Sequence, residues 1–402
     1  MQDITPKIVI LISIATLLSA CGGGGNSSGD VDNTITTEVA LGEKLFFDKN
    51  LSKNRTQSCS TCHDPDHAFI DARLDSLTNK IGKVSLGDDN VSVGVRNTPT
   101  ASYAKFSPNF HTGRRNRLNS KQPNYQGVLG GQFLDGRELD LKGQAGGPPL
   151  NPVEMNMPDK ATAIARIMEN SAYIEAFKRF YGDTIFKDTD KAFLKMTTSI
   201  AKFEKTAQFS PFDSKYDRSL KDPTILSLKE AFGKSLFFSQ QFTNCASCHQ
   251  LRPNGHSQET FSSYEYHNIG VPSVRTASST GKADKGLFDN TAKDADIGKF
   301  KVPTLRNVAV TEPYMHNGVF QDLRTVIEFY DKFLTNSQHT HNPETGKPWK
   351  NAEFPATVSL TELVDGKKMN SDRIEAMVCF LRTLTDKKYE HLIQEKGISC
   401  KD

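Results

Sequence analysis

Two Cys-X-X-Cys-His motifs are the residues of this chain most clearly suited to chemistry. They are Cys59-Ser60-Thr61-Cys62-His63 and Cys245-Ala246-Ser247-Cys248-His249. In each motif two thiols one helical turn apart can form thioether bonds to the vinyl groups of a haem, and the adjacent His can ligate the iron from one face. A thioredoxin-like redox pair needs neither the His nor a second copy, and a zinc site would lack a complementary ligand set. The motifs therefore predict two covalently bound haems of the c type.

The ligand on the other face of each iron separates an enzyme from an electron carrier. A six-coordinate iron passes electrons on, whereas an open face binds peroxide or oxygen. Spacing alone does not identify these ligands. The residues whose side chains are suited to the role are His67, His111, His256, His267, His316, Met155, Met315 and Tyr330.

The N-terminal segment has the pattern of an export signal. Lys7 precedes an apolar run over residues 8–18 that is too short to span a bilayer, and Leu18-Ser19-Ala20-Cys21 follows. This sequence resembles a lipobox, which predicts a signal peptide over 1–20, a lipid anchor on Cys21 and a flexible tether over 21–36. Gly22 after the anchor favours the periplasmic side of the outer membrane. An ordinary secretory signal with a chance Cys is the alternative, and it exports the chain as well.

Two cysteines near the C-terminus belong to neither motif. In an oxidising compartment Cys379 and Cys400 can form a disulfide. A buried Cys379 beside a free Cys400 thiol is the other reading. The sequence leaves both open.

Composition excludes several classes of protein. The 402 residues are 36% apolar and 24% charged, which argues against disorder and against a multi-span membrane protein. The net charge of +3 is spread along the chain, so it favours neither nucleic acid nor a membrane surface as a partner. We expect contact with the membrane only through the lipid anchor.

The chain repeats itself around the two motifs. Segments 41–47 and 232–238 are similar apolar stretches ahead of each Cys pair, and segment 96–100 has a counterpart at 302–307. A repeat of this length predicts a duplicated domain rather than a solenoid. We expect two cytochrome c-like haem domains, 37–222 and 223–402, related by internal duplication.

The fold class expected is mainly α with long loops. Helical spacing of apolar residues covers segments 161–181, 191–206, 323–334 and 372–384. No sustained period-two run bounded by hairpin turns is evident. The Gly, Pro and Asn-rich segments 143–158 and 335–355 are predicted to be long loops, which are often functional.

The motifs together resemble those of the di-haem cytochrome c peroxidase and MauG family. The similarity extends from about Glu38 to Leu384 and includes segments 133–137 and 302–318. It implies that His63 and His249 are the proximal ligands, that the first haem reacts with peroxide and that the second handles electrons. The distal His of many such peroxidases falls at Asn79 here, so the first haem is predicted to be open, as in MauG.

The resemblance also implies further site residues. Gln144 and Glu154 match the distal pocket of the first haem, where a carboxylate would move a proton between the two peroxide oxygens. Tyr330 lies fourteen residues after His316 and matches the second ligand of the second haem in MauG-like members. Its hard, anionic oxygen would favour oxidised iron. Periodicity alone makes it a packed helix residue.

Two more features of the family bear on this chain. A calcium ion between the haems would be held by the side chain of Asn97 and by backbone carbonyls of Thr311 and Pro313, since calcium prefers oxygen ligands. Asn97 can equally be a turn residue. The family commonly has a Trp between the haems, and Leu134 occupies that position here.

The resemblance predicts a periplasmic di-haem oxidoreductase that reduces hydrogen peroxide with electrons from a small cytochrome c or cupredoxin. A MauG-like oxidase that modifies residues of a partner protein is one alternative. A non-enzymatic di-haem electron carrier is the other. The sequence leaves a monomer and a homodimer both open.

Overall fold

The computed structural model describes residues 34–117, 122–239, 241–274 and 283–401. Residues Ile35–Asp402 form one compact unit. The predicted signal peptide, the lipid anchor at Cys21 and most of the predicted tether lie outside the described residues. Within the described ranges, no helix is both long and apolar enough to cross a membrane.

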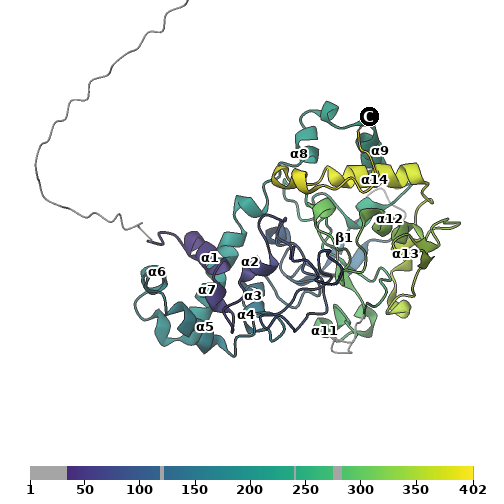
Figure 1. Ribbon diagram of the computed structural model, residues 1–402. Helices are drawn as coiled ribbons and strands as arrows, with labels where there is room; N and C mark the ends of the chain where they lie inside the picture. The colour runs from purple at the N-terminus through teal and green to yellow at the C-terminus, as the bar shows by residue number, and fades with distance from the viewer. Residues whose placement is uncertain (1–33, 118–121, 240, 275–282, 402) are drawn as a thin grey trace, which may run out of the picture. The chain divides into compact units, whose positions relative to one another are not determined.

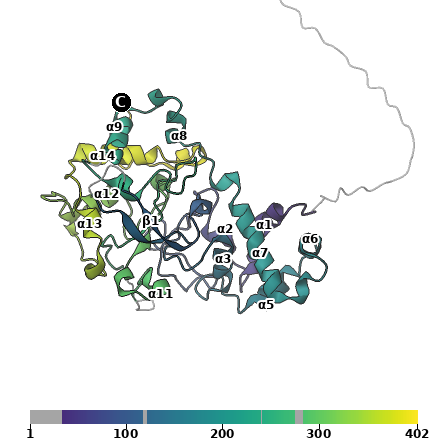
Figure 2. The same ribbon diagram turned by 180° about the vertical axis from the view of Figure 1, so that it is seen from behind.

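The described residues are mainly helical, as the sequence predicts (Figures 1 and 2). The α-helices are α1 Glu38–Phe46, α2 Cys59–Cys62, α3 Leu141–Gln144, α4 Gly147–Leu150, α5 Lys160–Ile167, α6 Ser171–Tyr181, α7 Thr189–Glu204, α8 Lys215–Ser219, α9 Leu228–Phe238, α10 Cys245–Cys248, α11 Phe288–Thr291, α12 Leu323–Asp331, α13 Leu360–Leu363 and α14 Ser371–Arg382. The 3-10 helices are η1 Lys49–Leu51, η2 Ala104–Phe106, η3 Ile185–Lys187, η4 Ala207–Phe209, η5 Pro223–Ile225, η6 Asp294–Asp296, η7 Val308–Val310, η8 Pro355–Thr357 and η9 Lys387–Leu392.

Short antiparallel strand pairs lie in the segments between the helices. β1 His111–Arg115 pairs with β2 Tyr125–Leu129, β3 Tyr266–His267 with β4 Phe300–Lys301, and β5 His341–Asn342 with β6 Lys347–Pro348. The β1–β2 pair was not expected from the sequence. β1 is mostly exposed along its length, so it carries no alternation of apolar and polar residues that would mark it as a strand.

The predicted helix over 161–181 is two helices. α5 ends at Ile167, and the side chain of Asn170 accepts a hydrogen bond from the backbone N–H of Ala172 at the start of α6. An Asn that caps a new helix competes with continuation of the old one, so the apolar pattern runs across a break in the backbone. The other predicted helices agree with α7, α12 and α14 within a few residues.

The first helix of each half packs closely on a later helix of the same half. A Cβ atom added at Gly42 of α1 would lie 1.9 Å from the backbone O of Ser199 in α7. A Cβ atom added at Gly233 of α9 would lie 1.8 Å from the backbone O of Ala376 in α14. Only glycine permits such close backbone approach. Both views show α1 beside α7 and α9 beside α14.

Each helix pair belongs to its own hydrophobic core. The first core includes Leu41, Leu45 and Phe46 of α1, and the second includes Leu236 and Phe237 of α9. Tyr216, which precedes the predicted domain boundary at 222/223, packs in the second core. Two halves that each contain one close helix pair and one hydrophobic core are the arrangement expected of duplicated domains. Duplication and the domain boundaries remain predictions.

A buried arginine connects residues from both halves of the chain. The Arg306 guanidinium forms an ion pair with Asp217 at 2.6 Å and donates to the backbone O of Glu259. It also lies within 6 Å of four aromatic ring centroids, namely Tyr103, Phe212, Tyr216 and Phe261. Nearby, the Tyr103 hydroxyl donates to Asp386 at 2.6 Å, so contacts between distant segments extend beyond Arg306.

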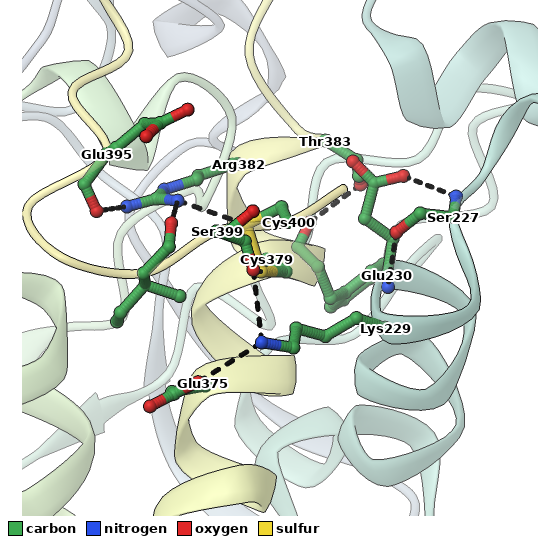
Figure 3. The surroundings of a disulfide bond; sticks show 12 residues. Ser227, Lys229, Glu230, Glu375, Cys379, Arg382, Thr383, Glu395, Ser399 and Cys400 are labelled. Carbon is green, nitrogen blue, oxygen red and sulfur yellow. Dashed lines mark hydrogen bonds and ion pairs between the residues drawn. A yellow bond between two sulfur atoms is a disulfide. The ribbon is translucent and has the colours of Figure 1, made fainter. Parts of the chain in front are cut away.

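The C-terminal tail is held against α14 by a disulfide and by two cations (Figure 3). Cys379 and Cys400 are bonded, which decides between the two readings left open by the sequence. Arg382 donates to the backbone O atoms of Ile398, Gln394 and Glu395. Lys229 of α9 donates to the backbone O of Ser399 at 3.0 Å and pairs with Glu375.

The close contact of α9 and α14 predicts the effect of one methyl group. Gly233→Ala should lower the free energy of unfolding by about 1–3 kcal/mol, because the added Cβ forces the two backbones apart. Gly94→Ala is the matched control, since a Cβ at Gly94 would meet nothing within 4 Å. We expect the control to stay within about 0.5 kcal/mol of the natural chain in denaturant unfolding. Equal stability of both variants would contradict the packing described.

Candidate haem sites

Each Cys-X-X-Cys segment is a single helical turn followed by its histidine. α2 and α10 consist of the Cys-X-X-Cys residues themselves, and His63 and His249 are the residues at which these helices end. In α2 the side chains of Ser58 and Thr61 cap the helix start in both directions. The two thiols of each pair are therefore on the first and last residues of one helical turn, which is the geometry that thioether attachment requires.

Both histidines are fixed by a hydrogen bond to a backbone carbonyl. His63 Nδ1 lies 3.0 Å from Phe69 O, and His249 Nδ1 lies 3.0 Å from Phe261 O. A carbonyl only accepts, so Nδ1 must carry the proton and Nε2 keeps its lone pair. Burial lowers the pKa of His249 to about 4 and lowers that of His63. Each imidazole is therefore neutral, which is the form that ligates a metal.

The four thiols of the motifs are free in the described structure, whereas the two C-terminal cysteines are bonded to each other. Burial raises the pKa of the Cys62 thiol to about 12 and that of Cys245 to about 11. Such thiols are poor disulfide-exchange nucleophiles. Two Cys pairs that are each followed by a His fit covalent haem attachment better than a redox pair.

A cavity of about 420 Å³ surrounds the second motif. Its lining includes Cys245, Cys248, His249 and Tyr330. α12 positions Tyr330, whose ring lies beside Phe329 with 6.2 Å between centroids. Burial, with a smaller effect of the neighbouring thiols, raises the pKa of the Tyr330 hydroxyl above its usual range. The phenol and the imidazole thus line one space, as two ligands of one iron must.

Glu154 lies near the first motif in a partly buried position. Asn151 Nδ2 donates to its Oε1 at 2.6 Å, and burial raises the pKa of its carboxyl above the usual value. Its charge contributes, after burial, to the raised pKa of both Cys59 and Cys62, which places the carboxyl within electrostatic reach of both thiols. The positive charge of Arg137 acts in the opposite direction to burial and lowers the pKa of Glu154.

Gln144 is the last residue of α3, and a turn-rich segment connects it to Glu154. Asp140 caps α3 through the N–H of Gly143, and Met155 N donates to Pro148 O at 3.2 Å. The segment predicted as a long loop over 143–158 therefore contains the end of α3 and all of α4. These short helices hold Gln144 and Glu154 in one local structure.

The predicted calcium residues lie around the same cavity as Tyr330. Asn97, Thr311 and Pro313 all contribute to its lining. The Asn97 side-chain amide donates to the backbone O of Lys83 at 3.2 Å, and the backbone N–H of Asn97 donates to the backbone O of His316. No hydrogen bond is seen from a described residue to the carboxamide oxygen, which is the atom that a cation would bind, and Asn97 itself lies in no turn.

The other candidate ligands lie in varied places. The His67 ring pairs with the Asp64 carboxylate near the surface, and His111 and His256 are exposed. Met155 is buried in the first core. His316 and Met315 line the cavity, where the His316 ring stacks on Phe300 at 3.8 Å.

A buried polar cluster beside Cys248 contains His267, a candidate ligand from the sequence, together with Glu265 and Arg117, which the sequence did not indicate. Arg117 pairs with Glu265 at 2.6 Å, and His267 Nε2 lies 2.8 Å from the same carboxylate. One ligand-type atom from each of Cys248, Glu265 and His267 lies within 4.8 Å of the others. Because Cys248 belongs to the haem motif and Glu265 already has two cationic partners, we do not treat this cluster as a metal site. Only chain folding brings Arg117 to Glu265, so no local pattern could have revealed it.

Comparison with known proteins agrees with this geometry. The family model for di-haem cytochrome c peroxidase matches residues 36–224. The chain is 43% identical to the methylamine utilization protein MauG of Paracoccus denitrificans, over 98% of this chain and 100% of that protein. It is 30% identical to a cytochrome c551 peroxidase of Nitrosomonas europaea, over 96% of this chain and 92% of that protein. The chain therefore belongs to the di-haem cytochrome c peroxidase and MauG family, and it is an enzyme of that type.

Solved structures agree with the fold. The di-haem peroxidase BthA of Burkholderia thailandensis matches with a TM-score of 0.75 and 27% identity, over 92% of this chain and 91% of that one. A MauG-like protein associated with microbial copper homeostasis matches with a TM-score of 0.63 and 26% identity, over 92% of this chain and 94% of that one. Membership of a di-haem family implies two haems for the chain.

Proposed function

We propose that this enzyme reduces hydrogen peroxide to water with electrons from a small c-type cytochrome or cupredoxin. The observation that carries the proposal is Glu154, a partly buried carboxyl that Asn151 holds by a hydrogen bond, with a raised pKa and within electrostatic reach of the first pair of haem-attachment thiols. Each turnover consumes one peroxide, two electrons and two protons and forms two waters. A site for this reaction needs a group that holds and moves protons, and a carboxyl with a raised pKa is suited to that task.

The residues around the first haem have separate roles in this proposal. Cys59 and Cys62 attach the haem, and His63 ligates its iron through Nε2. When bound, the haem supplies an iron that binds and reduces peroxide at its open face. Glu154 would accept the proton of one peroxide oxygen and return it to the other, while the Gln144 amide would orient the peroxide by hydrogen bonding.

The residues around the second haem hold electrons rather than substrate. Cys245 and Cys248 would attach this haem, and His249 and Tyr330, which line the same cavity, would ligate its iron. An anionic phenolate stabilises oxidised iron and so lowers the potential relative to a neutral ligand. Asn97, Thr311 and Pro313, which all line the cavity, would hold a calcium ion through oxygen atoms.

The proposed location is the periplasm, with the mature chain anchored to the outer membrane through Cys21. The support is the lipobox-like segment at the N-terminus and the disulfide at the C-terminus, because disulfides form in oxidising compartments.

A second candidate function is the peroxide-dependent modification of a partner protein. The observation that favours it is the 43% identity to a methylamine utilization protein MauG over nearly the whole chain. Leu134 matches the position at which the family commonly has a Trp between the haems. A leucine side chain cannot be oxidised and reduced in turn as a Trp can, which favours reduction of peroxide over long-range oxidation of a partner. Turnover with a small cytochrome donor, compared with turnover of candidate protein substrates, separates the two functions.

The haem-attachment sites predict a simple count. Cys62→Ser and Cys248→Ser should each lower the haem content from two per chain to one, because the altered motif lacks one of the two thiols that the attachment of its haem requires. A pyridine haemochrome assay against protein concentration measures the content. Cys400→Ser is the control and should keep both haems. Two haems in either motif variant would rule out the assignment.

The role of Glu154 predicts a loss of reactivity without a loss of haem. Glu154→Gln should slow the reaction with peroxide by roughly 100- to 10,000-fold, the usual contribution of a positioned acid–base group. In the natural enzyme the rate should rise with pH through the raised pKa of Glu154, because only the carboxylate accepts a proton, and the variant should lack that rise. Stopped-flow mixing with peroxide measures both, with exposed Glu175→Gln as control. A variant as fast as the control would exclude Glu154.

The ligand role of Tyr330 predicts a change in spectrum and potential. Tyr330→Met should place a thioether on the second iron, raise its potential and introduce a sulfur-to-iron absorption band in the far red. Tyr314→Phe is the matched control, because Tyr314 lines the same cavity. Spectroelectrochemistry measures both properties. If Tyr330→Met left both unchanged, Tyr330 would be a packed helix residue and Met315 or Met369 the next candidate.

A further inference from the structure

Lys301 is a partly buried lysine held in place through its backbone. It is the last residue of β4 and pairs with Tyr266 of β3. Its N–H donates to the backbone O of Leu134 at 2.8 Å. Since the backbone is fixed from both sides, the side chain has a restricted range of positions. Its ammonium donates to Ser107 Oγ at 3.3 Å and to the backbone O of Gly131.

The Lys301 ammonium has no anionic partner among the described residues. Its two acceptors are neutral oxygens. The carboxylate that acts on it from a distance is Asp135, which is already paired with Arg96 at 2.7 Å and Arg137 at 2.9 Å. Burial lowers the pKa of Lys301 to about 7. A cation that loses part of its hydration without gaining a counter-ion is destabilised, so this position is suited to an anion that the polypeptide does not supply.

The cavity around the second haem motif contains this lysine. Among its described lining residues, Lys301 is the only Lys or Arg, and it shares the lining with Cys245, Cys248 and His249. His267, a buried residue that also lines the cavity, is already paired with Glu265 at 2.8 Å. A c-type haem carries two propionate carboxylates, so its entry would bring negative charge into a cavity with one unpaired cation.

We propose that the Lys301 ammonium binds a propionate carboxylate of the haem attached at Cys245 and Cys248. This site rests on the haem attachment proposed above. The Ser107 hydroxyl and the Gly131 carbonyl hold two of the three ammonium protons, and the third is directed to the propionate. By partly neutralising that carboxylate, Lys301 raises the potential of the second haem, because positive charge nearby disfavours ferric iron.

The test is the midpoint potential of each haem in the purified two-haem protein. Lys301→Met keeps the length of the side chain and removes its charge. It should shift the ferrous-to-ferric equilibrium of the second haem about tenfold toward ferric, which is 59 mV for a one-electron couple. Lys301→Arg retains the charge and should recover most of that shift.

The matched control is Lys299→Met. Lys299 lies two residues earlier and pairs with Asp296 at 3.1 Å, outside the cavity lining. It should leave both potentials unchanged. If Lys301→Met does not accumulate, Lys301→Gln takes its place under the same criterion.

The outcomes separate this proposal from the proposed function. Two intact haems with unchanged potentials in Lys301→Met, or a shift confined to the first haem, would overturn the propionate site alone. A haem count that stays at two in Cys248→Ser would overturn the attachment on which it rests. A shift of the second haem that Lys301→Arg restores supports the site, since a merely structural role would not depend on charge.

Discussion

An imidazole that donates a hydrogen bond from one nitrogen has only the other to offer to a metal. In both halves of this chain the acceptor is a backbone carbonyl, that of Phe69 for His63 and that of Phe261 for His249. Both phenylalanines have a positive φ, 57° and 53°, which is unfavourable for a residue with a side chain and is sustained only where packing enforces it. Phe69 stacks on Phe209 at 4.1 Å, and Phe261 meets Tyr216 edge to face at 5.1 Å. The aromatic core of each half thus determines where a carbonyl is aimed, and the carbonyl determines which nitrogen is available.

Much of the site could be predicted because its signals are local. The Cys-X-X-Cys-His motifs occupy one helical turn each, and the apolar spacing of segment 372–384 is a good guide to α14. The break at Asn170 was not predicted, since the apolar pattern continues across it. β1 was missed because an exposed strand has no buried face to create alternation. The roles of Gln144, Glu154 and Tyr330 come from family resemblance rather than from physics, and they remain proposals.

The charged groups around the cavity could not be predicted from sequence for a different reason. Arg117 and Glu265 are separated by 148 residues and Arg96 and Asp284 by 188, yet each pair is in direct contact. No local pattern encodes such pairing, because only the folded chain decides which charges are buried together. The same holds for Lys301, whose sequence neighbours give no sign that it lacks a counter-ion. Where buried charges are paired they specify the fold, and where one is left over it points to a ligand.

The position of Arg306 has a consequence for how the polypeptide holds together. Its guanidinium contacts Tyr103 and Phe212 from the first half and Phe261 from the second, and Asp386 joins Tyr103 to Asn307. A chain cleaved at residue 222 would therefore yield two fragments, neither of which alone could shield that cation or complete that hydrogen-bonded triad. Each fragment would keep its own hydrophobic core but would expose part of this shared contact surface, so the two fragments should stay associated after cleavage.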